Sequence, residues 1–303
     1  NHSFSQIIGS TSAPYINSLA NQGALMTDST GVEHPSQPNY LDLFSGSNQG
    51  VTSDNRPTDI PFTTPNLGAE LLGAGLSFAT YSESLPSVGF DGDSFSTDPT
   101  LNEYMRKHNP ASNWVNSPAG TNQLPASVNQ PFTSFPTDFS QLPTVSFVVP
   151  NEQHDMHDGT IQQADSWLQT NLDSYVQWAK SNNSLLIVTW DENDLSPGNQ
   201  IPTLLVGPMV YPGTSNQAIN HFNVLRTVED MYGLPYAGAS ATATPITSVF
   251  TVTGTPNAPV LNASSDTGVS HTDGITQNNA SAAAPWVFLS LIHISEPTRQ
   301  AEI

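Results

Sequence analysis

The chain has 303 residues, only 11% of them charged, and 6 Lys and Arg residues against 26 Asp and Glu residues give a formal net charge of −20. Nucleic-acid backbones and anionic membranes are bound through clusters of Lys and Arg, so this balance argues against both as electrostatic partners. It still allows a phosphorylated small substrate whose charge a bound metal ion neutralises. The chain has no cysteine, which excludes disulfides and cysteine-ligated zinc. No apolar run is long enough to span a bilayer.

The pattern of residues 1–250 predicts an α/β domain. Short apolar or β-branched runs bounded by Gly, Pro, Asn or Ser predict strands at 76–81, 145–149, 185–190 and 203–206. A helix is predicted over 161–180, where apolar residues recur every three or four positions, and another over 224–232, before Gly233 and Pro235. Alternation of strand, helix and strand predicts a parallel sheet.

The remaining segments differ from this pattern. Residues 86–143 are rich in Pro, Ser, Asn and Thr without periodicity, which indicates a long irregular insertion that shapes the substrate mouth. We interpret 251–258 as a linker and 259–288 as the opening of a bacterial Ig-like repeat, too short to close a core. Residues 289–303 resemble the translation of a transposase adapter used in sequencing libraries, so we predict no element of the natural fold from them. The other interpretation of this tail is a natural amphipathic segment.

Two distant segments carry the chemistry. The apolar run 185–190 ends in Asp191 and Glu192, and in open α/β sheets ligands bind at the carboxyl ends of the strands. The segment His34-Pro35-Ser36 places a hydroxyl in a turn rich in Pro and Gly. A hydroxyl and a pair of carboxylates are the parts that metal-assisted phosphoryl transfer needs.

Ordered stretches along the chain carry a resemblance: 1–9, 13–20, 34–46, 107–110, 150–159, 189–194, 220–227 and 229–235. Together they resemble the bacterial phosphoesterase family, which groups phospholipase C-type and acid-phosphatase-type enzymes in the alkaline phosphatase superfamily. The resemblance implies an alkaline-phosphatase-like α/β fold, with a mostly parallel central sheet and helices on both faces. It also implies a strand and an acidic metal ligand just before Asn1, so we expect the N-terminal strand to be truncated.

The resemblance gives Ser36 the role of a nucleophile that attacks phosphorus beside a metal ion, which lowers the pKa of its hydroxyl. Ser36-Gln37-Pro38-Asn39 is similar to the Thr-x-Pro-Asn pattern of nucleotide pyrophosphatases, and by that likeness Asn39 donates a hydrogen bond to a phosphoryl oxygen. Tyr40 stands where sulfatases have Arg, which counts against a sulfatase. The alternative for Ser36 is an ordinary loop serine between prolines.

The same resemblance implies a divalent metal ion held by Asp191, Glu192 and Ser36, with Asn1 as a further ligand. Carboxylate oxygens suit Ca, Mg, Mn or Zn, and both the identity of the ion and the choice between one ion and two stay open. The alternative for Asp191 and Glu192 is a carboxylate pair that caps the following loop.

Residues 150–158 are dense in imidazole and carboxylate groups directly after a predicted strand. The superfamily has an Asp-x-x-x-His metal pair at such a place, and that spacing falls here on Asn151 and Asp155. His157 is a further candidate ligand, and His154 and Asp158 are open alternatives, as is a solvated polar loop without metal.

Three more residues complete the expected site. His221 resembles the last histidine ligand of the superfamily, although a helix-entry residue hydrogen-bonded to its loop is the alternative. Lys107 and His108 are expected to contact the substrate phosphate, or else to lie on the surface.

The leading hypothesis is a secreted or cell-surface, metal-dependent hydrolase of phosphate esters that works through a phosphoseryl intermediate, like an acid phosphatase. Its partner is then a phosphorylated small molecule or a phospholipid. The alternatives are a phospholipase C-type phosphodiesterase and a catalytically inactive domain of a surface adhesin. Because a strand and a metal ligand are expected upstream, we expect the chain from Asn1 to bind metal weakly until that segment is restored.

Overall fold

The computed structural model describes residues 2–250, 286–289 and 292–294. The α-helices are α1 (Phe4–Ile7), α2 (Pro14–Gln22), α3 (Ser36–Ser45), α4 (Leu67–Gly73), α5 (Ile161–Ala179) and α6 (His221–Tyr232). The strands are β1 (Ala24–Met26), β2 (Phe78–Ser82), β3 (Ser94–Phe95), β4 (Tyr104–Met105), β5 (Asn129–Pro131), β6 (Val145–Val149), β7 (Leu186–Thr189), β8 (Thr203–Val206), β9 (Gly213–Ser215), β10 (Trp286–Leu289) and β11 (Ile292–Ile294). None of the helices in these ranges is long and apolar enough to cross a membrane.

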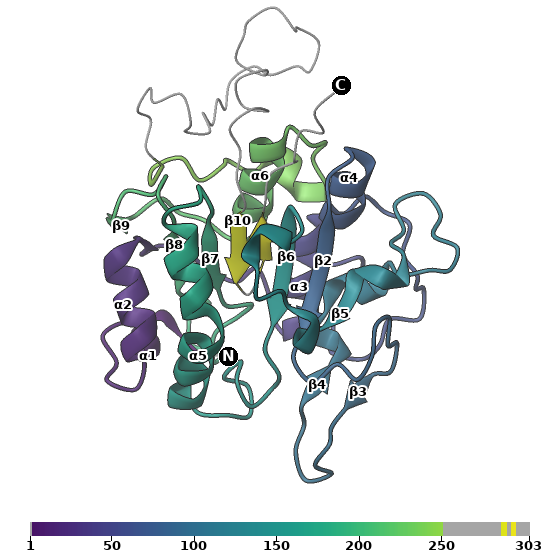
Figure 1. The fold of residues 1–303 in the computed structure, drawn as a ribbon, viewed down its shortest axis with the longest axis horizontal. Coiled ribbons are helices and arrows are strands. Elements are labelled where there is room, and N and C mark those ends of the chain that lie inside the picture. Colours follow the sequence, from purple (N-terminus) through teal and green to yellow (C-terminus); the bar gives the residue numbers. More distant parts are fainter. Residues whose placement is uncertain (1, 251–285, 290–291, 295–303) are drawn as a thin grey trace, which may run out of the picture.

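In the described part of the chain, one sheet has the strand order β5-β2-β6-β11-β10-β7-β8-β1-β9 (Figure 1). Strands β5, β2 and β6 pair in parallel, whereas β8 pairs with β7 and with β1 in antiparallel fashion. The four strands predicted from the sequence correspond to β2, β6, β7 and β8. The predicted α/β fold with a parallel sheet and helices is confirmed.

Strands β10 and β11 lie between β6 and β7 in this sheet (Figure 1). Phe288 of β10 pairs with Phe147 of β6, and Leu289 pairs with Val188 of β7. These strands belong to the segments that we interpreted as an Ig-like opening and an adapter-derived tail, and both interpretations stay predictions. The proposed linker and most of the Ig-like segment lie outside the described residues.

Helices cover both faces of the sheet, and each face has its own apolar core. Along β6, Val145 and Phe147 pack with α3, α4 and α6, while Val148 points the other way and packs with α2 and α5. This division follows from the alternation of side chains along a strand. Figure 1 shows α2 and α5 together on one side of the sheet.

Local sequence explains where the helices that carry the site begin. Thr160 and Gln163 form a capping box at the start of α5, which begins at Ile161 as predicted. Asn220 caps α6 by accepting a hydrogen bond from the backbone of Phe222, so this helix begins three residues before the predicted Val224. The Asn220 cap brings His221 into the first turn of α6.

Helix α3 is a correction to the sequence prediction, which placed Ser36 in a turn. Ser36 is the first residue of α3, and all ten residues of this helix are buried. The helix ends at Gly46, whose φ of 66° is left-handed. A Cβ at this position would lie 2.0 Å from the carbonyl oxygen of Ala237, so only glycine fits the close approach.

The predicted irregular insertion, 86–143, contains only the short strands β3, β4 and β5 and five 3₁₀ helices. The first of these, η1 (Arg106–His108), carries both residues expected to contact phosphate. Buried Arg106 fixes η1 in place because its guanidinium donates to the side chain of Asn113 and the carbonyl of Ser112. The insertion therefore reaches the site through η1.

Candidate active site

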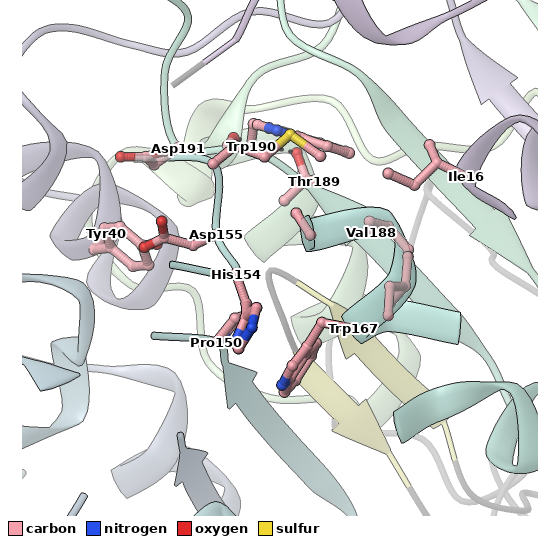
Figure 2. Close-up of a pocket in the computed structure, with 13 residues that line it drawn as sticks. Ile16, Tyr40, Pro150, His154, Asp155, Trp167, Val188, Thr189, Trp190 and Asp191 are labelled. Carbon is pink, nitrogen blue, oxygen red and sulfur yellow. Dashed lines mark hydrogen bonds between the residues drawn. The ribbon is translucent and has the colours of Figure 1, made fainter. Parts of the chain in front are cut away.

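A pocket opens where β6 and β7 end (Figure 2). Its wall includes Pro150, directly after β6, and Thr189, the last residue of β7. Figure 2 shows Asp155 and Asp191 together at one end of this pocket, and Ile16 at the other. The carboxylates thus gather at the edge of the sheet where α/β proteins bind ligands.

Ser36 and Glu192 come together at this edge although 156 positions separate them in the sequence. The Ser36 hydroxyl donates to Glu192 Oε1 at 2.9 Å, and Ser36 is 1% exposed. Ser36 opens α3, where backbone N–H groups favour an anion, and Glu192 follows β7 by three residues. The predicted convergence of the serine and the carboxylate is observed.

His34 is a member of this group that the sequence did not single out. Its Nδ1 contacts the second oxygen of Glu192, so that this carboxylate bridges His34 and Ser36. Burial and the neighbouring charge of Asp191 raise the pKa of Glu192, against the hydrogen bonds from His34 and Ser36. The sequence feature that could have identified His34 as a site residue is its position two residues before Ser36.

Asp191 offers an oxygen with no hydrogen-bond partner. Its Oδ2 is buried and has no hydrogen-bond partner among the described residues, while its backbone carbonyl accepts a hydrogen bond from His221 Nε2 at 2.6 Å. Two adjacent carboxylates with an orphaned buried oxygen, beside a hydroxyl, are a hard-oxygen donor set that fits a divalent cation. Asp191, Glu192 and Ser36 are therefore the residues that could hold the predicted metal ion.

His108 lies deep in the same site and faces Asp155. The two side chains form an ion pair at 3.0 Å from Nδ1 to Oδ2, and the imidazole stacks on Tyr40 with 5.1 Å between ring centroids. Burial lowers the pKa of His108, but the Asp155 carboxylate outweighs it and the pKa lies above its ordinary value. Within the described part of the chain Nε2 of His108 is buried without a hydrogen-bond partner, so it can donate to a bound group.

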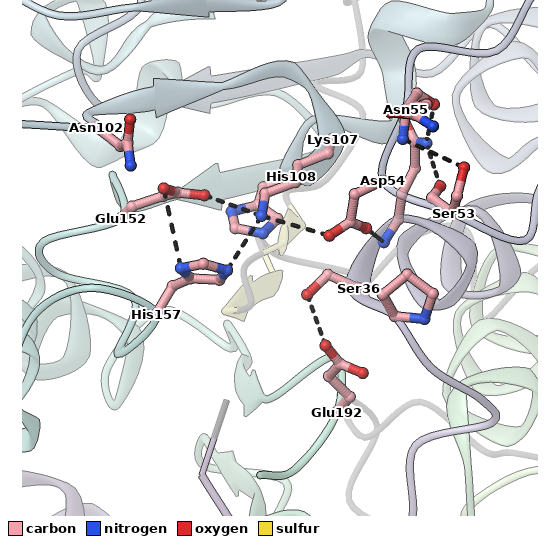
Figure 3. Close-up of polar contacts among 12 residues, drawn as sticks. Ser36, Ser53, Asp54, Asn55, Asn102, Lys107, His108, Glu152, His157 and Glu192 are labelled. Atoms are coloured by element: carbon pink, nitrogen blue, oxygen red, sulfur yellow. Dashed lines mark hydrogen bonds and ion pairs between the residues drawn. The ribbon is translucent and has the colours of Figure 1, made fainter. Parts of the chain in front are cut away.

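Lys107 is surrounded by acceptors in the adjoining part of the site (Figure 3). Its Nζ lies 3.1 Å from Glu152 Oε1, 3.1 Å from His157 Nε2 and 3.5 Å from Asp54 Oδ2. Burial lowers the pKa of Lys107, but the carboxylates of Glu152 and Asp54 raise it above the ordinary value. Asp54 also accepts from the backbone N–H of Gln37, which ties this group to the start of α3.

Comparison with known proteins identifies the family of the chain. The Phosphoesterase family matches residues 9–235. The chain belongs to this family. It is 48% identical over 252 residues, 82% of this chain and 80% of the relative, to a phosphatidylinositol-3-phosphatase of Mycobacterium tuberculosis. It is 32% identical over 233 residues, 73% of this chain and 51% of the relative, to an acid phosphatase of Aspergillus fumigatus. This chain thus spans about half of the fungal protein.

A solved structure shows the fold. A Vibrio parahaemolyticus protein in the alkaline phosphatase superfamily aligns with a TM-score of 0.51 and 12% identity, over 78% of this chain and 65% of the other. At this identity the likeness speaks for the fold alone. As a member of the Phosphoesterase family, the chain is a phosphoric ester hydrolase.

Some of the predicted site residues of this phosphoesterase lie in supporting positions. Asn39 is fully buried, and its side-chain amide donates to the carbonyls of Glu33 and Pro35 while its oxygen accepts from two backbone N–H groups. In this structure Asn39 therefore shapes the loop that precedes Ser36. Its role as a donor to phosphate stays a prediction.

The predicted metal ligands after β6 divide in a similar way. Asn151 donates to Ser84 and accepts from the backbone of Gln153, so it anchors the turn. Asp155 faces His108, and His157 faces Lys107. Ligand atoms of Glu152, His157 and Asp158 lie within 4.8 Å of one another. Asn1 lies outside the described residues.

Glu152 and Asp54 were not singled out in the sequence. Glu152 lies in the predicted cluster at 150–158, and burial at 2% exposure distinguishes it only in the folded chain. Asp54 follows α3 in a loop without a recognisable motif. Its part in the site arises from contacts to Gln37 and Lys107 that tertiary structure alone supplies.

Proposed function

We propose that this protein is a metal-dependent phosphatase that transfers the phosphoryl group of a monoester to Ser36 and then to water. The contact between Ser36 Oγ and Glu192 Oε1 carries the proposal, because it joins a nucleophile to a proton acceptor at the start of a helix. The buried imidazole of His108 and the ammonium of Lys107 supply positive charge beside them.

The first step follows from these contacts. Ser36 Oγ forms a bond to phosphorus and its proton moves to Glu192 Oε1, as the ester bond breaks and the leaving oxygen takes a proton from His108 Nε2. Asp155 holds His108 in the orientation that directs Nε2 at the bound group. A divalent cation held by Asp191 and Glu192 would supply Lewis acidity and neutralise phosphoryl charge.

The second step reverses the roles. Water attacks the phosphoserine and gives its proton to the now neutral His108, while the Ser36 oxygen leaves and recovers the proton from Glu192. Inorganic phosphate and the resting site result. The contacts of Ser36 with Glu192 and of His108 with Asp155 support this proposal over the inactive-adhesin alternative.

For the substrate, we propose a phosphorylated alcohol of the kind found in lipid headgroups. The relative at 48% identity is a phosphatidylinositol-3-phosphatase, which supports a monoester on a polyol. A phospholipase C-type diesterase stays the alternative. We further propose that the protein acts outside the cytoplasm, a suggestion motivated by its acidic, Lys-poor composition.

Trapping the intermediate tests this mechanism. Acid quenching during turnover of a phosphate monoester should leave one phosphoryl group on the Ser36 peptide in mass spectrometry, and Ser36→Ala should carry none. The assay is run with residues 1–303 and with a chain extended upstream of Asn1, each with Mn²⁺ and after chelation. Turnover without any phosphoserine would refute the intermediate. Hydrolysis of a bis-ester but not of the monoester would favour the diesterase.

A further inference from the structure

The surroundings of Lys107 are those of a metal ion rather than those of a surface lysine. Three side chains converge on its ammonium: the carboxylates of Glu152 and Asp54, and the imidazole of His157 (Figure 3). The Lys107 side chain is 10% exposed and that of Glu152 is 2% exposed. Carboxylate and imidazole groups are the usual ligands of a second divalent cation in two-metal phosphatases.

The tautomer of His157 follows from its partners. An ammonium group only donates, so the Nε2 that faces Lys107 at 3.1 Å must be the acceptor nitrogen. The other nitrogen, Nδ1, then carries the hydrogen and donates to Asp158 Oδ1 at 2.8 Å. A histidine that presents one lone pair to a cation and gives its other N–H to a carboxylate is arranged like a metal-ligating histidine.

The position of the ammonium is tied to the nucleophile. Asp54 accepts from Lys107 through one oxygen, and through the other it accepts from Gln37, the residue after Ser36, at 3.0 Å. The ring of His157 also lies beside that of His108, with 5.8 Å between centroids. These contacts link the ammonium to the residue after Ser36 and, through His157, to the ring beside His108.

We infer that the Lys107 ammonium occupies the place of a second metal ion, so that the enzyme works with one divalent cation and one built-in organic cation. This inference rests on the proposed function, which places the divalent cation at Asp191 and Glu192. Lys107, held in place by Asp54, Glu152 and His157, supplies a fixed positive charge that neutralises the phosphoryl group, and it does not exchange with metal ions in solution. Removal of the ammonium leaves a preformed set of ligands with no cation.

The test counts cations in Lys107→Ala, and the probe is Mn²⁺ alone in equilibrium dialysis. We expect this variant to bind one Mn²⁺ more per chain than the wild type, and its kcat/KM to fall roughly 10²-fold. Lys107→Arg keeps a cation in place and should bind no additional ion. Adding His157→Ala to Lys107→Ala should abolish the gained ion. Lys180→Ala is the matched control, because the Lys180 ammonium donates to the side-chain amides of Gln22 and Gln177 and forms no ion pair among the described residues.

A second measurement does not depend on whether Lys107→Ala folds. In the wild-type background His157→Ala should lose no bound Mn²⁺, because His157 holds the ammonium. Loss of one Mn²⁺ per chain in His157→Ala would overturn the inference, as would equal Mn²⁺ counts in wild type and folded Lys107→Ala. If both counts come out as expected but no variant or wild type hydrolyses a phosphate ester, the proposed function fails and the cation replacement stands.

Discussion

Carboxylates are buried in two regions of this molecule, and the two regions hold them in different ways. At the ends of β6 and β7, three carboxylates face a potential cation or a hydroxyl: Glu192 faces His34 and Ser36, Asp155 faces His108, and Glu152 faces Lys107. Beneath α3, α4 and α6, the carboxyl groups of Asp42, Glu70 and Glu229 form no ion pair among the described residues. We call these three residues the interior carboxyl group.

The interior carboxyl group keeps its protons to a higher pH than free carboxyl groups do. Burial raises the pKa of Asp42 to about 8, with help from the charge of Glu33, and raises the pKa of Glu70 to about 8 and that of Glu229 to about 7. Both side-chain oxygens of Glu70 are buried without a hydrogen-bond partner, whereas Glu229 accepts from Ala237 and Ser240. Burial is thus the largest cause of all three raised pKa values, and in Glu229 it outweighs the opposing charge of Arg226.

The comparison teaches that burial alone does not identify a functional acid. In the site, side chains on η1, α3 and the loop before α3 lie against the carboxylates and compensate their negative charge. A phosphate or metal ion that binds there would compete with these contacts. The three residues of the interior carboxyl group form no ion pair among the described residues, and at acidic pH their side chains carry no charge. The two regions should therefore respond to different perturbations.

The largest expected effect comes from the nucleophile. Ser36→Ala should lower kcat by about 10³-fold or more, because the proposed phosphoseryl intermediate needs the Ser36 hydroxyl. The measurement is hydrolysis of a chromogenic phosphate monoester, with the thermal midpoint of unfolding as a check on folding. Ser45→Ala, at the other end of α3, is the matched control, because its hydroxyl donates only to the carbonyls of Leu41 and Ser47. Full activity in Ser36→Ala would show that Ser36 is not the nucleophile and that the region at the ends of β6 and β7 is not the active site.

A smaller loss is expected at the partner of His108. Asp155→Asn removes the charge that holds the imidazole protonated, and a charge-assisted hydrogen bond is worth about 1.5–3 kcal/mol, or roughly 10- to 100-fold in kcat/KM. Its matched control is Asp165→Asn, since buried Asp165 caps α2 through the backbone of Tyr15 and Ile16 and forms no hydrogen bond with Ser36, Glu192 or His108 among the described residues. Asp165→Asn should lower the thermal midpoint without changing kcat/KM. Equal kinetics in both variants would show that His108 needs no charged partner.

The interior carboxyl group should dominate how stability depends on pH. Unfolded carboxyl groups titrate near about 4, so between that pH and about 7 to 8 the folded chain binds more protons than the unfolded chain. Its contribution to stability is complete below pH of about 4 and is lost as the pH rises through this interval. The thermal midpoint should therefore be higher at pH 5 than at pH 8.

Glu70→Gln isolates one member of this group. The neutral amide cannot ionise, so the variant should lose part of the pH dependence and be more stable than wild type at pH 8, by roughly 2–4 °C for each kcal/mol regained. The control is Asp59→Asn at an exposed position, and it should leave the pH dependence of the thermal midpoint unchanged. If the thermal midpoint of the wild type instead rose steadily from pH 5 to pH 8, ionisation of the interior carboxyl group would not lower the stability of the folded chain.

The sequence was a good guide wherever local periodicity or an ordered motif carried the information. The apolar runs of β2, β6, β7 and β8 are unbroken and short, so they are recognised without tertiary context. Asp191 and Glu192 could be placed at the site because a strand must end before them. Ser36 could be joined to them only through the resemblance, since no local pattern links residues 156 positions apart.

What escaped prediction depends on contacts between distant segments. Helix α3 is buried on all sides, so it lacks the amphipathic stripe by which helices are recognised. His34 acquires its place from Glu192, 158 positions away, and Asp54 acquires its place from Lys107 and Gln37. The interior carboxyl group is likewise invisible in the sequence, where Asp42, Glu70 and Glu229 look like ordinary surface acids of helices.

The smallest effect is expected where a charged pair belongs to neither region. Arg56 pairs with Asp91 and Asp93, but its side chain is 35% exposed and those of the aspartates are 62% and 66% exposed. Exposed pairs contribute about 0–1 kcal/mol because water screens them. Arg56→Gln should therefore shift the thermal midpoint by less than about 4 °C, and this shift should shrink at high salt. Buried Arg106 shares Asp91 with Arg56 and also donates to Asn113 and Ser112, so Arg106→Gln leaves buried acceptors unpaired and should cost far more. If Arg56→Gln lowered the thermal midpoint as much as Arg106→Gln, exposure would not be the property that separates structural from incidental charges in this protein.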